Sequence, residues 1–304
     1  CWFEWCDSLL QFASRLAIAR DTKIVTRLHR YEVFTSFPAM TNWNNIDGLI
    51  LVTNHLRHLL PTHLPSKVEI RIIENGVDID KFTYKERKKG YNIGFIADLI
   101  PRKNPILLLQ IIDRLVKIDK RYKLFVAGAF KDELIKLYWD YTIDELNLKE
   151  NVIFDGWQTN INEWLEDKNY ILSTSIHESF GYNIAEAMVK GIKPVIYNFP
   201  YSKEIWDQKY LFNTIDEAVS LITEDNYVSY EYRDFVEKRY SLKKEIEQII
   251  YFLEYIEKKP VVKSVKVEEK NSTRDVVIFG ASTLGRAAYE ICKNRYKVLF
   301  FCDN

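Results

Sequence analysis

The stretch HESFGYNIAEAM, residues 177–188, decides the fold that the sequence predicts. It follows the apolar run Tyr170–Thr174, which predicts a buried strand, and it continues into a helical pattern that ends at Gly191. A loop that joins the carboxyl end of a parallel strand to a helix opens onto the ligand crevice of an open α/β sheet. We therefore expect a ligand site in this loop.

Strand and helix patterns alternate on both sides of this stretch. Strict alternation predicts parallel βαβ units and a doubly wound α/β sheet. The expected strands are 91–97, 122–127, 151–154, 169–174 and 194–197, and the expected helices are 105–118, 131–146, 183–190, 215–223 and further helix within 228–257. Before residue 78 the patterns predict a helix over 3–19, strands at 23–28, 48–52 and 68–73, and a short helix at 54–60.

The loop and the helix carry groups suited to a phosphorylated sugar. Backbone N–H groups near Phe180, Gly181 and Tyr182 lie at the expected helix N-terminus, where they can bind phosphate oxygens. Glu178 and Glu186 can accept hydrogen bonds from two separate sets of hydroxyls on one extended ligand, such as a sugar and a ribose. The simpler interpretation is a solvated helix with two unrelated acids.

The Glu-x7-Glu spacing, with Phe180-Gly181 after the first Glu, resembles retaining glycosyltransferases of family 4, which have the GT-B fold of two Rossmann-like domains. The resemblance covers about residues 1–257. Further stretches that agree with it, in order, are Asn75-Gly76-Val77-Asp78 with Phe82, Lys103-Asn104, Val126-Ala127-Gly128, Gly156, and Gly191-x-x-Pro194-Val195.

The resemblance implies a site and a reaction. It implies that Glu178 faces the donor hexose, that Glu186 holds the ribose hydroxyls and that Lys103 lies on the donor diphosphate. The other residues expected at the donor are Arg102, Gly128, Gly156, Trp157, Phe180, Gly181 and Tyr182. Trp157 either borders the nucleobase or packs into the protein. The implied reaction moves a sugar from a nucleotide-sugar to an acceptor hydroxyl with retention, and needs no cofactor beyond this donor.

Asp98 departs from the pattern of that family, which usually has Arg at this position. An acid beside a diphosphate would repel it, and Arg102 could supply the missing charge-assisted bonds. Without that compensation the chain would be a non-catalytic sugar- or nucleotide-binding relative or a scaffold. A second alternative is a glycoside hydrolase with Glu178 and Glu186 as its acid pair, which would need the two carboxyl groups roughly 5–9.5 Å apart.

The region before residue 78 contributes one candidate. His29, in Arg27-Leu28-His29-Arg30 after an expected strand, resembles the active-site His that faces the donor sugar from the acceptor side. A partly buried, hydrogen-bonded histidine explains it equally well.

A metal site is not expected from this sequence. His55, His58 and His63 fit no closed site because Pro61 interrupts their helix. Asp78-Ile79-Asp80 imitates a metal-binding D-x-D motif but lies in a turn.

Composition argues against several classes of protein and indicates where the protein is located. The 304 residues carry 43 Lys plus Arg and 43 Asp plus Glu, so no net positive field favours nucleic acid. The four cysteines form no C-x-x-C pair, which favours a reducing cytosol. No signal peptide and no apolar run of roughly 18 residues is present, so we expect a cytoplasmic protein. The acceptor is expected to be a glycan, a lipid-linked sugar or a protein in bacterial surface polysaccharide assembly.

Four segments are expected. Residues 1–77 form an incomplete N-terminal acceptor-side domain, 78–257 the donor domain, 258–274 a linker, and 275–304 the start of a further Rossmann-like domain with the motif G-x-S-x-x-G-R at 280–286. The basic run Lys85–Lys89 predicts a solvated loop; contact with anionic lipid, as a peripheral protein at the inner face of the membrane, is the alternative.

Overall fold

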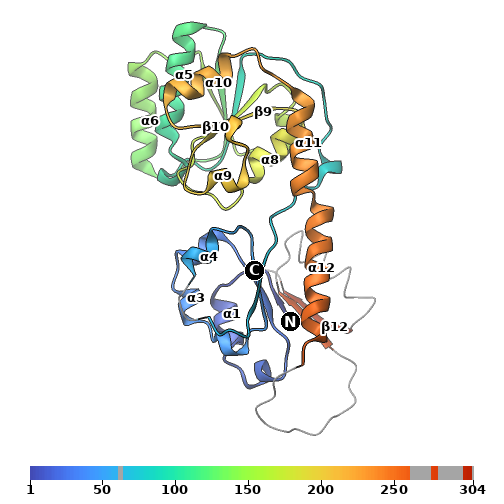
Figure 1. The fold of residues 1–304 in the computed structure, drawn as a ribbon. Helices are drawn as coiled ribbons and strands as arrows, with labels where there is room; N and C mark the ends of the chain where they lie inside the picture. The colour runs from blue at the N-terminus through green and yellow to red at the C-terminus, as the bar shows by residue number, and fades with distance from the viewer. Residues whose placement is uncertain (61–63, 261–274, 280–296, 303–304) are drawn as a thin grey trace. The chain divides into compact units, whose positions relative to one another are not determined.

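The computed structural model describes residues 1–60, 64–260, 275–279 and 297–302, and the chain divides into two compact units (Figure 1). Unit 1 comprises Cys1–Asn75 and Lys243–Asn304, and unit 2 comprises Gly76–Leu242. Each unit contains a six-stranded parallel sheet with helices. The prediction of α/β units with parallel sheets is confirmed.

The sheet of unit 2 has the order β10-β9-β8-β5-β6-β7. Its strands are β5 (Asn92–Ile96), β6 (Lys123–Ala127), β7 (Val152–Gly156), β8 (Tyr170–Ser173), β9 (Lys193–Tyr197) and β10 (Leu211–Phe212). Its helices are α5 (Pro105–Ile118), α6 (Glu133–Glu145), α7 (Ile161–Trp164), α8 (Tyr182–Val189), α9 (Ser202–Ile205), α10 (Ile215–Thr223) and α11 (Ser229–Tyr240). The predicted strands and helices of this region agree with these bounds to within two residues at most ends.

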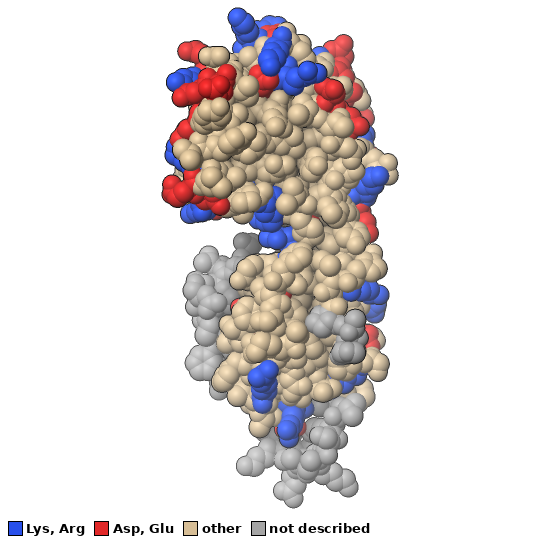
Figure 2. Space-filling view, turned by 90° about the vertical axis from the view of Figure 1, so that its left-hand side faces the viewer, with Lys and Arg blue, Asp and Glu red and all other residues tan. Residues whose placement is uncertain are grey.

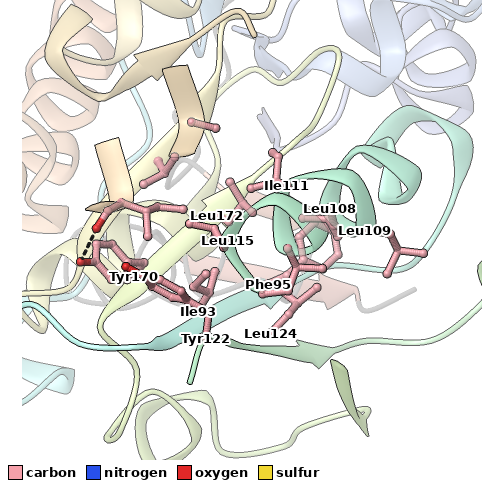
Figure 3. Close-up of a cluster of buried hydrophobic side chains, with 14 of the residues drawn as sticks. Ile93, Phe95, Leu108, Leu109, Ile111, Leu115, Tyr122, Leu124, Tyr170 and Leu172 are labelled. Carbon is pink, nitrogen blue, oxygen red and sulfur yellow. Dashed lines mark hydrogen bonds between the residues drawn. The ribbon is translucent and has the colours of Figure 1, made fainter. Parts of the chain in front are cut away.

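Two apolar clusters lie on the faces of this sheet because successive strand side chains point to opposite sides. Leu172 of β8 belongs to the cluster that includes α5, whereas its neighbour Ile171 packs with α8. Figure 3 shows the first cluster, in which the Tyr170 hydroxyl donates a hydrogen bond of 2.8 Å to the carbonyl of Ile222. β8 is therefore packed on both of its faces.

The sheet of unit 1 has the order β12-β11-β1-β2-β3-β4. Its strands are β1 (Trp2–Phe3), β2 (Val25–Leu28), β3 (Gly48–Leu51), β4 (Glu69–Ile72), β11 (Asp275–Phe279) and β12 (Lys297–Cys302). Its helices are α1 (Ser8–Ala13), α2 (Arg30–Val33), α3 (Phe37–Met40), α4 (Leu56–Leu59) and α12 (Leu242–Lys258). The helix predicted over 3–19 is shorter in the structure. Trp2 and Phe3 pair with β2 as a strand, and α1 begins after Asp7, whose carboxylate accepts hydrogen bonds from the N–H groups of Leu9 and Leu10.

The domain boundaries differ from the predicted ones in two places. Most of α12 belongs to unit 1 rather than to the donor domain, because Ile249, Phe252 and Ile256 pack against Ile50 and other side chains on one face of its sheet. Gly48 permits this contact, since a Cβ there would lie 3.0 Å from the Phe252 ring.

The strands β11 and β12 also belong to the sheet of unit 1, whereas the sequence predicts that they begin a separate domain. β11 pairs in parallel with β1 and supplies hydrogen bonds to an edge that β1 would otherwise leave unpaired. Residues 261–274 of the predicted linker and the glycine motif at 280–286 lie outside the described residues.

Candidate active site

The strand order of unit 2 reverses between β5 and β8. Chain order runs outward from β5 to β6 and β7 on one side, and from β8 to β9 and β10 on the other. In open α/β sheets ligands bind at this switch point, beyond the carboxyl ends of the strands. The loop after β5 carries Arg102 and Lys103, and the loop after β8 carries Glu178.

Direct hydrogen bonds hold these two loops together. The Ile176 N–H donates to the carbonyl of Arg102 at 3.0 Å, and the Thr174 hydroxyl donates to the carbonyl of Lys103 at 2.7 Å. Asn104 then takes a left-handed conformation, with φ of 47°, and Pro105 begins α5. Backbone geometry thus fixes the positions from which the Arg102 and Lys103 side chains extend.

Glu178 accepts hydrogen bonds from both cations. Arg102 Nη1 lies 2.7 Å from Glu178 Oε1, and Lys103 Nζ bonds to the same oxygen. Burial raises the pKa of Glu178, but the charges of Lys103 and Arg102 outweigh burial and hold this pKa below its ordinary value. The three side chains together carry a net positive charge, which suits an anionic ligand.

Glu186 has a different environment on the buried side of α8. No hydrogen-bond or ion-pair partner contacts its carboxylate within the described ranges, and none connects it with the Glu178 cluster. Burial raises the pKa of Glu186 to about 7, and the charge of Lys81 opposes this only in part. A half-buried carboxyl group without a partner favours a ligand that brings hydroxyl donors.

The N-terminus of α8 has no side-chain cap. Its capping residue is Gly181, with φ of 110°, a conformation that an L side chain rarely adopts. Because no side chain accepts from the first turn, the N-terminal amides keep their preference for an anion. The Asn183 side chain donates to the carbonyl of Ile96 at 2.9 Å and so ties this helix start to the end of β5.

Gly128 and Gly156 lie at the ends of the neighbouring strands. A Cβ at Gly128 would lie 2.0 Å from the carbonyl oxygen of Ala97, so only glycine fits there. Gly156 has φ of 69° with open space around its Cα, and its carbonyl accepts from the Gly128 N–H at 2.9 Å. Asp98, where the family usually has Arg, accepts a hydrogen bond of 3.3 Å from the Ala129 N–H.

The three predicted donor-binding aromatic residues have different environments. Trp157 is 73% exposed, so it does not pack into the core. The Phe180 side chain is buried among Trp206 and Tyr240, so only its backbone could face a ligand. Tyr182 is exposed and contacts the Phe180 ring edge-on.

His29 follows β2 in unit 1, within a polar cluster that the sequence analysis missed. Its Nε2 lies 3.3 Å from Glu4 Oε1, and its ring stacks on Trp5 at 4.3 Å between centroids. The fully buried Arg27 donates to Glu4, to Asn75 and to Glu245. The only signal in the sequence for this cluster is a polar Arg-x-His following an apolar strand.

Two of the remaining residues singled out in the sequence, His55 and Arg87, have structural partners. His55 is buried and lies 2.9 Å from the Thr53 hydroxyl, while His63 lies outside the described residues. Within the part of the chain that the structure describes, no group of three or more His, Cys, Asp or Glu could hold a metal ion. The prediction of a solvated loop at residues 85–89 is wrong for Arg87, which is buried and donates to the carbonyls of Lys190, Glu166 and Lys168.

Comparison with known proteins identifies the class of this fold. Residues 77–215 match the family described as "Glycosyl transferases group 1", and the fold is that of GT-B glycosyltransferases. This match favours a glycosyltransferase over the glycoside-hydrolase alternative. No described helix is long and apolar enough to cross a membrane.

Two bacterial relatives are named as glycosyltransferases. The chain is 28% identical over 162 residues to a poly(ribitol-phosphate) alpha-N-acetylglucosaminyltransferase of Staphylococcus aureus, covering 53% of this chain and 31% of that protein. It is 24% identical over 147 residues to a UDP-Gal:alpha-D-GlcNAc-diphosphoundecaprenol alpha-1,3-galactosyltransferase of Escherichia coli, covering 43% and 37%. The chain thus spans about a third of the length of these relatives.

Solved structures share the fold. A mutant of S. aureus TarM in complex with Fondaparinux, alpha-GlcNAc-glycerol and UDP matches with a TM-score of 0.63 and 24% identity, over 75% of this chain and 50% of that one. HepE of Anabaena in complex with UDP-glucose matches with a TM-score of 0.64 and 18% identity, over 81% and 75%.

Proposed function

We propose that this chain transfers a sugar from a nucleoside-diphosphate sugar to an acceptor hydroxyl, with retention at the anomeric carbon, during assembly of a bacterial surface glycan. The observation that carries this proposal is the cluster of Arg102, Lys103 and Glu178 at the switch point, where the uncapped start of α8 also lies. Relatives that use activated sugars, and structural neighbours bound to UDP, support the choice of donor.

In this proposal Lys103 and Arg102 bind the departing diphosphate. The bond between the anomeric carbon and the diphosphate oxygen breaks, the acceptor oxygen bonds to that carbon, and the acceptor proton leaves with the diphosphate. Lys103 and Arg102 stabilise the charge that develops on the diphosphate, together with the amides at the start of α8. Glu178 holds both cations in position before the donor arrives, which lowers the cost of ordering them.

Glu186 would contribute affinity rather than chemistry. Its carboxyl group can accept hydrogen bonds from the two ribose hydroxyls and so gain the partners that the ligand-free protein does not give it. We propose retention because the sequence resembles family 4. The proposal requires no cofactor or metal. The acceptor is proposed to be lipid-linked, as the name of the E. coli relative states for that protein, with the chain in peripheral contact with the membrane.

A calorimetric titration with UDP, GDP and ADP tests the donor site directly. Wild-type protein should bind one of them, Lys103→Ala should weaken binding, and Glu186→Ala should weaken binding of the nucleotide but not of inorganic diphosphate. Asp80→Asn, which changes an exposed acid in the short 3-10 helix Ile79–Lys81, is the matched control and should bind like wild type. Equal affinity of wild type and both site variants for every nucleotide would contradict the site assignment.

Transfer is tested separately from binding. Incubation of the nucleotide-sugar selected by calorimetry with lipid-linked acceptors should give a glycosylated product of unchanged anomeric configuration, read by NMR. Nucleotide binding without product from any acceptor would instead select the non-catalytic relative.

A further inference from the structure

The chain passes between the two units twice, between residues 75 and 76 and between residues 242 and 243. We call residues 75–77 and 240–245 the two connections. Their unit 2 ends lie side by side: the Val77 N–H donates to the carbonyl of Tyr240 at 2.7 Å, and the Leu242 N–H donates to the carbonyl of Val77 at 2.9 Å. A Cβ at Gly76 would lie 2.6 Å from the Leu242 Cα, so this close approach requires glycine. The two connections are therefore paired with each other.

A single guanidinium in unit 1 holds both connections. Arg27 of β2 is fully buried, and its Nη2 lies 2.7 Å from the side-chain oxygen of Asn75 on the first connection. The same nitrogen donates to the carboxylate of Glu245 on the second connection. Hydrogen bonds between a guanidinium and a carboxylate are stronger than those between neutral groups. Arg27 therefore fixes the unit 1 ends of both connections.

The same guanidinium reaches His29 through one carboxylate. Arg27 Nη1 lies 3.3 Å from Glu4 Oε1, and His29 Nε2 lies 3.3 Å from that same oxygen. The second oxygen of Glu4 accepts from the Trp2 indole at 3.2 Å, so both carboxylate oxygens have partners. Three contacts in series therefore lead from Asn75 to the imidazole ring of His29.

The charges of this network are hidden from solvent. Glu4 is 3% exposed, Glu245 is 2% exposed and Arg27 is 0% exposed. On the face of unit 1 that Figure 2 shows, in the lower half of the picture, very little red is visible, in keeping with the burial of these acids. Water cannot replace a lost partner at a buried charge, so the loss of one contact forces the others to rearrange. A change at either connection is therefore expected to reach the Glu4 carboxylate.

The Glu4 carboxylate also selects the tautomer of His29. Burial raises the pKa of Glu4, but the hydrogen bond with His29 and the charge of Arg27 outweigh burial and hold this pKa below its ordinary value. An ionised carboxylate can only accept hydrogen bonds, so His29 Nε2 carries the hydrogen and Nδ1 of the neutral ring is an acceptor. Stacking on Trp5, at 4.3 Å between centroids, further fixes the ring. His29 follows β2 at the carboxyl edge of a parallel sheet, where an acceptor nitrogen suits a ligand hydroxyl.

We propose that Arg27 and Glu4 are positioning residues, which tie the His29 ring to the two connections and hold its Nδ1 as the acceptor for a sugar hydroxyl. This inference rests on the proposed function in one respect, since a sugar substrate brings the hydroxyl. Because the contacts run through both connections, the orientation of the ring depends on the conformation of these segments. A substitution at Asn75 should therefore alter His29 from three contacts away.

The tautomer of the His29 ring tests the proposal without an activity assay. In protein with isotope-labelled histidine, heteronuclear NMR spectra of the neutral rings show which nitrogen carries the hydrogen, and His29→Gln assigns the signal. Wild type should show only the Nε2–H tautomer. Glu4→Gln and Asn75→Ala should both lose this single tautomer, whereas Asn75→Asp keeps an acceptor oxygen and should retain it. The matched control Glu69→Gln, which breaks an ion pair just beyond the end of α12 in the same unit, should resemble wild type.

Transfer kinetics give a second readout. Asn75→Ala should lower kcat by about 10-fold with unchanged affinity for UDP, because only the orientation of His29 changes, and Asn75→Asp should restore kcat. His29→Ala then identifies the substrate that brings the hydroxyl. It is the donor if the variant binds the nucleotide-sugar more weakly but UDP equally well, and it is the acceptor if only the KM for the acceptor rises.

Four results would overturn the inference. They are a wild-type His29 that carries its hydrogen on Nδ1, an unchanged His29 signal in both Glu4→Gln and Asn75→Ala, an equal change of this signal in Glu69→Gln, and a His29→Ala variant that binds both substrates like wild type. A cooperative thermal transition shows that each variant is folded. UDP titration separates the two claims, because absent UDP binding refutes the donor site and leaves the NMR readout unaffected.

Discussion

The unpaired carboxyl group of Glu186 should destabilise the ligand-free protein at neutral and alkaline pH. Its pKa is raised from 4.5 to about 7 by burial, so the folded protein holds this proton more tightly than the unfolded chain does. For an acid with a raised pKa, folding stability falls as pH rises from the unfolded value through the folded one. Glu186→Gln removes this titration and should therefore stabilise the protein increasingly between pH 4.5 and 7.

The magnitude follows from the size of the shift. A shift from 4.5 to about 7 corresponds to a penalty of about 3 kcal/mol once the group is fully ionised, near pH 8. At pH 5 most of this penalty is absent, and about 1 kcal/mol remains. Glu186→Gln should thus gain roughly 2 kcal/mol relative to wild type between pH 5 and pH 8.

Urea unfolding at several pH values measures this gain in stability. Glu178→Gln is the comparison variant, for which a loss of stability is expected. The Lys103 and Arg102 charges lower the pKa of Glu178 against the effect of burial, so ionisation of Glu178 stabilises the fold above its unfolded pKa. Glu178→Gln should destabilise the protein at neutral pH. If Glu186→Gln is no more stable than wild type at pH 8, or if its gain does not change with pH, the described environment of Glu186 is wrong.

Three further substitutions test the donor site, the buried ion pairs of unit 1 and the glycines at the strand ends of unit 2. Lys103→Ala should weaken UDP binding by about 10-fold or more, measured by calorimetry, because it removes a charge-assisted bond to the diphosphate. Arg27→Met should cost about 3–5 kcal/mol in urea unfolding, since it removes the buried cation that neutralises Glu4 and Glu245; an unchanged midpoint would show that this network is not stabilising. Gly128→Ala should lower the thermal midpoint far more than Gly156→Ala, because only at Gly128 would a Cβ clash with backbone, at 2.0 Å; equal effects would mean that φ alone matters.

The fold of unit 2 was predictable because its segments are locally consistent. The strands around β5 and β8 are short apolar runs, and Pro105 and Gly191 mark the start of α5 and the end of α8. Unit 1 was harder to predict. Trp2-Phe3 is a strand of two residues, which is too short for sequence periodicity to distinguish it from the helix that follows. It is a strand because it pairs with β2 and β11, which lie far from it in the sequence.

The sequence predicts a set of candidate site residues, but it does not predict the environments that the structure gives them. Sequence order places Lys103 after one strand and Glu178 after another, yet their contact depends on β5 and β8 being neighbours at the switch point. The cluster of Glu4 and Arg27 was missed because Glu245, its third member, lies more than 200 residues further along the chain. Local patterns carry no information about such a pairing.

The two acids of the Glu-x7-Glu spacing illustrate what the structure adds. Sequence assigns them one common role, as acceptors of sugar hydroxyls. In the structure Glu178 is ion-paired with Arg102 and Lys103, whereas Glu186 has a pKa raised to about 7 and no partner among the described residues. An acid held by two cations is suited to ordering them for a diphosphate, and an acid that lacks partners is suited to hydroxyls that arrive with the ligand. In the proposed function, the spacing therefore combines an acid that orders two cations for the diphosphate with one whose desolvation ligand binding would offset.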